Sequence, residues 1–89
     1  MPSYLVETYL PRSRAHEQGA RERRARSAAQ ELTRGATHVR FDRSIHVPAD
    51  EICFYVFDAP SANDAETAAQ RAGLDPIRVV EAVSSEKEK

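Results

Sequence analysis

The side chains of this chain that could bind a ligand or take part in catalysis fall into two groups. The first combines a carboxylate, a guanidinium, a thiol and two phenols: Glu7, Tyr9, Arg40, Cys53 and Tyr55. A carboxylate beside a tyrosine and a guanidinium can bind a small polar ligand or a metal. The second group is a pair of imidazoles, His38 and His46, and imidazole suits borderline metals such as nickel and zinc.

Glu7 stands out because it lies in the middle of a predicted central strand, where an unpaired charge is costly. Alternation along the strands predicts that Glu7, Tyr9, Cys53 and Tyr55 line one open face of a sheet, with Arg40 on the neighbouring strand. The group is either a ligand site or an ion pair that keeps two sheets in register at a dimer interface. We favour the ion pair, because no nucleophile or proton partner accompanies it.

The spacing of the histidines argues against a metal site within one chain. His38 and His46 are predicted on one strand face, but eight residues of about 3.3 Å each separate them by roughly 26 Å. His16 lies near the start of the first predicted helix, off that face. A site on His38 and His46 would need carboxylates or a second copy of the chain, and surface positions are the simpler expectation.

Cys53 is the only cysteine. An intrachain disulfide and a thiolate metal cluster are therefore excluded. A catalytic cysteine needs a base and an electropositive setting, and the predicted strands place no histidine beside it. A small core residue is the simpler interpretation.

Four segments have the character of strands. Ser3–Leu10 alternates in side-chain type, and Thr37–Val47 and Ile52–Asp58 are predicted to form a hairpin about a turn at Pro48. Ile52–Asp58 is apolar on both faces, which is typical of a central strand. Ile77–Val83 is the last predicted strand. In Thr37–Val47, alternation places four apolar side chains on one face: Val39, Phe41, Ile45 and Val47.

The first helix is predicted over Ser13–Arg34, with Ser13 as N-cap and Gly35 as a left-handed stop. Its firm part runs from about Gly19 to Thr33, because apolar residues recur there at helical spacing: Ala25, Ala28, Ala29 and Leu32. The arginines of this helix are interpreted as a solvated face.

The second helix is predicted to begin at Ser61, which with Asp64 forms a variant of the capping box, and to close at Gly73. Its packing stripe is made of small residues: Ala62, Ala65, Ala69 and Ala72.

The order βαββαβ predicts an α+β, ferredoxin-like fold, a four-stranded antiparallel sheet with two helices on one face. The first and third strands are expected in the middle. The other face is expected to carry Tyr9, Cys53, Tyr55 and Phe57, which is too apolar for water alone. We therefore expect a homodimer through the open sheet face.

Composition sets the broad class. Residues 1–84 are predicted to form a single domain and residues 85–89 a disordered charged tail. No run approaches the roughly 18–20 apolar residues of a membrane span, and no signal peptide is expected.

Residues 1–44 carry a net charge of +4 and residues 45–89 a net charge of −5. The arginines lack interleaved aromatics, so we expect no nucleic-acid partner and a cytoplasmic protein.

The sequence also resembles a family of small, largely uncharacterised ferredoxin-like proteins named after a nickel-binding, nickel-responsive member. Four stretches carry the resemblance: Tyr4-Leu5-Val6-Glu7-x-Tyr9-Leu10-Pro11, Arg43-Ser44-Ile45-x-Val47-Pro48-x-Asp50-Glu51-x-Cys53-Phe54, Phe57-x-Ala59-Pro60-Ser61 and Arg71-Ala72-Gly73-Leu74. The resemblance implies a dimeric α/β sandwich and nickel as the ligand.

Three functions compete at this point. The first is a non-enzymatic homodimer that binds a small ligand or a metal such as nickel. The second is a dimeric, cofactor-free enzyme of the oxygenase or isomerase type, for which alanine-rich helices would leave a substrate cavity. The third is a protein-interaction module. We favour the first.

Overall fold

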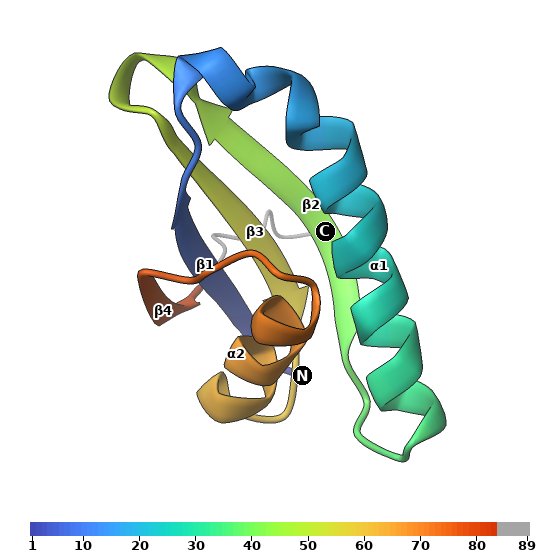
Figure 1. Ribbon diagram of the computed structural model, residues 1–89. Helices are drawn as coiled ribbons and strands as arrows, with labels where there is room; N and C mark the ends of the chain where they lie inside the picture. The colour runs from blue at the N-terminus through green and yellow to red at the C-terminus, as the bar shows by residue number, and fades with distance from the viewer. Residues whose placement is uncertain (84–89) are drawn as a thin grey trace, which may run out of the picture.

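Two helices cover one face of a four-stranded antiparallel sheet (Figure 1). The computed structural model describes residues 1–83, and the predicted tail at residues 85–89 lies outside them. The strands are β1 (Ser3–Tyr9), β2 (Arg40–Val47), β3 (Ile52–Asp58) and β4 (Arg78–Ala82). Their order is β2-β3-β1-β4. The ferredoxin-like βαββαβ fold and the central positions of the first and third strands are confirmed.

The first helical segment starts differently from the prediction. A 3-10 helix, η1 (Arg12–Glu17), precedes α1 (Gln18–Arg34). Ser13 is not the N-cap of α1; that position is Glu17, which makes no side-chain cap bond. The reason is that a residue distant in sequence fixes the turn before η1. The Arg12 N–H donates a hydrogen bond to Oε2 of Glu51 at 2.9 Å.

The end of α1 also differs. Gly35 has φ −88° and is not left-handed. The positive φ falls one residue later, at Ala36 (79°), because the backbone N–H of Thr37 donates a hydrogen bond to the carbonyl oxygen of Leu32 at 2.9 Å.

The cap of α2 (Ala62–Arg71) is confirmed. The Ser61 Oγ accepts a hydrogen bond from the Asp64 N–H at 3.1 Å, and Gly73 follows the helix with φ 71°.

We expect Ser61→Ala to lower the free energy of unfolding by about 1 kcal/mol, because one N–H of the first turn loses its acceptor. Urea unfolding would measure this change. Ser61→Asp, which keeps an acceptor, serves as the control, and an equal loss in both variants would contradict the capping role.

The faces of the two central strands are the main correction to the sequence analysis. Tyr4 pairs with Phe57, Val6 with Tyr55 and Thr8 with Cys53, and all six side chains are buried on the helix-covered face. Cys53, Tyr55 and Phe57 are therefore not on the open face. Because β3 is apolar on both sides, its composition could not choose between the two faces. Tyr9 does lie on the open face and is 55% exposed.

A bulge in β2 causes the second error in face assignment. The pairing with β3 shifts between Phe41 and Arg43, so alternation is interrupted at Asp42. Phe41 faces the helices, whereas Ile45 and Val47 pair with residues of the open face. The predicted common face of Val39, Phe41, Ile45 and Val47 is therefore wrong.

Small residues of the helices pack on aromatic residues of the sheet. Alanines form the buried stripes of both helices: Ala25, Ala28, Ala29, Ala65, Ala68, Ala69 and Ala72. Below them, the ring of Phe41 lies 5.5 Å from that of Phe57 and 6.2 Å from that of Tyr55, measured between centroids. Ala62, predicted in the stripe, is exposed, and Ala68 takes its place.

Candidate functional site

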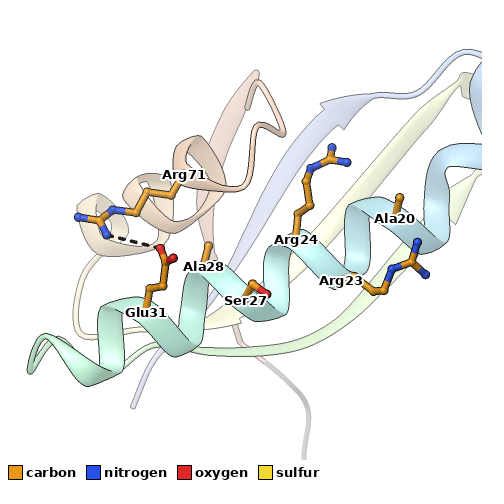
Figure 2. A pocket seen from close by; sticks show the side chains of 7 residues that line it. All are labelled: Ala20, Arg23, Arg24, Ser27, Ala28, Glu31 and Arg71. Carbon is orange, nitrogen blue, oxygen red and sulfur yellow. Dashed lines mark ion pairs between the residues drawn. The ribbon is translucent and has the colours of Figure 1, made fainter.

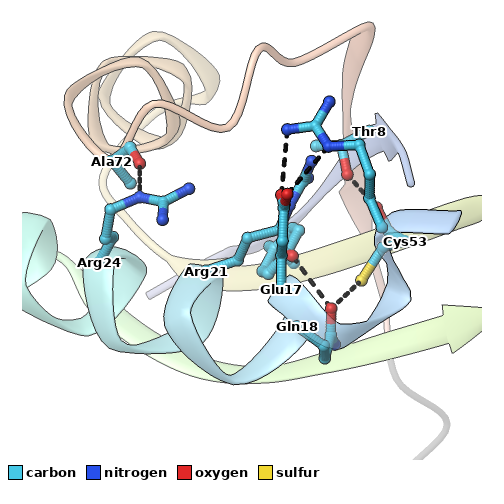
Figure 3. A network of polar contacts seen from close by, with 9 residues as sticks. Thr8, Glu17, Gln18, Arg21, Arg24, Cys53 and Ala72 are labelled. Atoms are coloured by element: carbon cyan, nitrogen blue, oxygen red, sulfur yellow. Dashed lines mark hydrogen bonds and ion pairs between the residues drawn. The ribbon is translucent and has the colours of Figure 1, made fainter. Parts of the chain in front are cut away.

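A cluster of polar side chains lies between the N-terminal part of α1 and the sheet (Figure 3). We call it the polar cluster. It draws residues from four elements, β1, α1, β2 and β3: Thr8, Gln18, Arg21, Ser44, Cys53 and Tyr55. Thr8, Cys53 and Tyr55 are fully buried. Buried polar groups must find partners or remain energetically costly, so each contact in the cluster matters.

Gln18 connects three members of the polar cluster, Ser44, Cys53 and Tyr55. Its Oε1 accepts hydrogen bonds from the Cys53 thiol and from the Tyr55 hydroxyl, each at 3.2 Å. Its Nε2 donates to the Ser44 Oγ at 2.7 Å, and the Ser44 hydroxyl donates to the carboxylate of Glu22. The amide is thus oriented from both ends, with its oxygen directed toward β3.

Arg21 is the member whose hydrogen bonding is incomplete. The residue is 6% exposed, and within residues 1–83 its buried Nε and Nη1 have no hydrogen-bond partner. Oε1 of Glu17 lies 3.8 Å from the Nε, but that carboxylate accepts two hydrogen bonds of 3.0 Å from Arg14. The bonding from Arg14 lowers the pKa of Glu17. A buried cation with unused donors is expensive, so a further acceptor is expected there.

Tyr55 is a hydrogen-bond donor in this environment. Burial raises the pKa of the Tyr55 phenol, and the neighbouring Cys53 thiol acts in the same direction. The nearby guanidinium of Arg21 acts in the opposite direction but does not outweigh burial. Tyr55 therefore keeps its proton at neutral pH and can donate it to an acceptor.

The structure does not assemble the site predicted around Glu7 and Arg40. Glu7 lies on the open face and pairs with Arg78, whose Nε is 3.4 Å from its Oε1. Arg40 also lies there, but its Nη2 pairs with the Oδ2 of Asp58 at 2.5 Å. The two cannot meet because β3 separates β1 from β2. Tyr9 lies on the same face as Glu7, whereas Cys53 and Tyr55 point to the helices.

The predicted metal ligands His38 and His46 are also apart. His38 is exposed and precedes β2. His46 lies near the far end of that strand and is directly opposite Cys53 in the pairing with β3. The expectation that no histidine lies beside Cys53 is therefore wrong. Its Nε2 is buried, with no hydrogen-bond partner in the described part of the chain. Among residues 1–83, no group of three or more His, Cys, Asp or Glu side chains could hold a metal ion.

A shallow groove between α1 and α2 lies on the outer side of the helical layer (Figure 2). Its two walls are bridged by an ion pair of 3.8 Å between Arg71 and Glu31. Nearby, the Nε of Arg24 donates to the backbone oxygen of Ala72 at 2.8 Å. These contacts join the helices, and we assign the groove a structural role.

Sequence reasoning missed Gln18 and Arg21, although a signal for both was present. The buried stripe of α1 contains Ala25 and Ala28. Counting back four residues from Ala25 gives Arg21, and three more give Gln18, so helical periodicity places both on the inward face. The interpretation of the arginines as a solvated face is wrong for Arg21. A polar continuation of a buried stripe was the clue.

Within residues 1–83, no helix has the length and apolar character needed to cross a membrane.

Comparison with known proteins bears on the fold. No protein-family model matches the sequence, and no curated protein matches it. The crystal structure of SCO4226 from Streptomyces coelicolor A3(2) is similar, with a TM-score of 0.62 and 17% sequence identity. The similarity covers 94% of this chain and 99% of that one. At this identity, it supports the fold.

Proposed function

We propose that this chain is a non-enzymatic homodimer that binds a small polar ligand in the polar cluster between α1 and the sheet. One observation carries the proposal: the guanidinium of Arg21 is buried, and two of its nitrogens find no acceptor among the described residues. Such a group is retained at a cost to stability, which is common at functional positions. The ligand would supply the missing acceptor.

The cluster favours binding over catalysis. The thiol of Cys53 donates to the amide oxygen of Gln18, and an amide oxygen is too weak a base to activate a nucleophile. The alanine-rich helices, which could have left a substrate cavity, pack instead on Phe41, Tyr55 and Phe57.

The open face of the sheet supports the homodimer. Its side chains form a largely apolar surface: Leu5, Ile45, Val47, Ile52, Phe54, Val56 and Val80. Two ion pairs, Glu7–Arg78 and Arg40–Asp58, lie on the same face. A second copy packed sheet to sheet would cover the apolar surface, and the charged pairs would favour one register.

Nickel is a second candidate ligand, favoured by the opposition of His46 and Cys53 across β2 and β3. An imidazole and a thiolate are both suitable donors for borderline metals. Two donors do not complete a site, so nickel would need water or further groups.

A cytoplasmic location belongs to the same proposal, because Cys53 is a buried free thiol. We expect no nucleic-acid partner.

Ligand binding can be tested on isotope-labelled protein purified without a metal-affinity tag. We would record amide spectra with three probes in turn: sodium acetate, acetamide and nickel chloride. A saturable shift at Gln18, Arg21 and Tyr55 with either organic probe would support the proposal. A response to nickel alone, centred on His46 and Cys53, would favour the second candidate. No saturable response to any probe would reject ligand binding by the cluster.

The oligomeric state is a separate test. Sedimentation equilibrium should give twice the chain mass of 10.0 kDa. A monomer at concentrations up to the millimolar range would contradict the homodimer and leave the ligand proposal standing.

A further inference from the structure

We propose that the ligand of the polar cluster is a small monoanion, either a halide-like inorganic ion or a short carboxylate, which accepts a hydrogen bond from an unused donor of Arg21. This inference rests on the proposed ligand-binding function and narrows it to one chemical class.

The charge next to the Arg21 guanidinium favours an anion. Glu17 and the two arginines paired with it, Arg14 and Arg21, carry one net positive charge between them, and the other carboxylate, Glu22, accepts from Ser44. Glu17 is held by Arg14 at 3.0 Å and lies 3.8 Å from the Nε of Arg21. The carboxylate therefore screens the buried guanidinium without making a hydrogen bond to it. One additional negative charge would neutralise Arg14, Glu17 and Arg21.

The hydrogen-bonding groups around Arg21 point the same way. Tyr55 and Cys53 are both donors and share a single acceptor, Oε1 of Gln18. The Nε and Nη1 of Arg21 likewise have no acceptor within residues 1–83. An incoming acceptor would satisfy these donors, whereas a cation would be repelled by the guanidinium.

Burial limits the size of the anion. Thr8, Cys53 and Tyr55 are fully buried, and Arg21 nearly so. The outer side is formed by the partly exposed Glu17 and the exposed Arg14. A chloride ion or an acetate-sized carboxylate would displace fewer buried side chains than a nucleotide or a sugar acid would.

The Nε–Hε resonance of Arg21 is the direct probe. We would titrate sodium acetate and, separately, sodium chloride into labelled protein in chloride-free buffer, with sodium HEPES holding the ionic strength constant. A saturating shift of this resonance at millimolar anion is expected. Saturation with acetate alone identifies a carboxylate site, and saturation with chloride alone identifies an inorganic-anion site.

Two variants control for surface effects. Arg21→Gln should weaken anion binding at least tenfold, followed at the amides of Gln18 and Tyr55. Arg23→Gln removes an exposed arginine of the same helix and should bind as the wild type does. Shifts that stay linear in the wild type with both anions would overturn the inference, and this result does not depend on whether Arg21→Gln folds.

The outcome also separates the two proposals. If acetamide gives a saturable response and both anions give none, the polar cluster binds ligands but not anions, and only this inference fails. If no probe responds, the proposed ligand-binding function fails with it.

Discussion

Replacing Arg21 with methionine is expected to raise the free energy of unfolding, by roughly 1–4 kcal/mol, in a buffer without chloride or carboxylates. Arg21 is 6% exposed, and two nitrogens of its guanidinium have no acceptor in residues 1–83. The folded state therefore bears a desolvation cost that the unfolded chain avoids. Methionine keeps much of the apolar stem and removes the charge. Glu17 is not stranded by the change, because Arg14 still holds it.

Guanidinium chloride brings its own anion, so urea unfolding in sodium HEPES is the appropriate measurement. Arg23→Met, at an exposed position of the same helix, should change stability by less than about 0.5 kcal/mol. Adding acetate should stabilise the wild type by mass action and leave Arg21→Met unaffected. A loss of several kcal/mol in Arg21→Met would show that the guanidinium is satisfied within the fold and has a structural role.

Alanine substitutions at Phe57 and Phe54 should have different consequences, because the two rings lie on opposite faces of β3. Phe57 is fully buried among the helices and β1, so Phe57→Ala should lower the free energy of unfolding by about 3–5 kcal/mol. For a domain of this size, that loss approaches its whole stability. Phe54 pairs with Glu7 and Ile45 on the open face, so Phe54→Ala should mainly weaken the dimer.

Unfolding at several protein concentrations distinguishes the two effects. Loss of stability in Phe57→Ala should appear at every concentration. In Phe54→Ala, the loss should grow with concentration relative to the wild type, and sedimentation should show more monomer. If Phe54→Ala left the dimer intact, the open face would not be the dimer interface.

Much of the fold could be predicted from local patterns. Proline at position 11, Ser61 with Asp64, and Gly73 mark the boundaries of elements, and each lies at or next to one in the structure. Strand β3, which is apolar on both faces, was correctly predicted to be a central strand. Its orientation could not be predicted, because both faces carry large apolar side chains and only the pairing with β1 and α1 selects between them.

The site was harder to predict for a related reason. The partners of charged residues depend on strand order and register, as the pairs Glu7–Arg78 and Arg40–Asp58 show. The face of Cys53 and Tyr55 depended on the same unresolved choice. Only Gln18 and Arg21 could have been located from sequence, by extending the alanine stripe of α1 into its polar half.

Asp42 is the extra residue of the bulge in β2. Phe41 and Ser44 are three positions apart and yet face the same way, because Asp42 falls outside the regular pairing. A related chain shorter by this residue would restore plain alternation and keep Ser44 and His46 opposite Tyr55 and Cys53. A one-residue gap in β1 or β3, which have partners on both edges, would instead exchange their buried and open faces. In an alignment of such proteins, a gap at this point of β2 would therefore be neutral for the polar cluster, and a gap in either central strand would mark its loss.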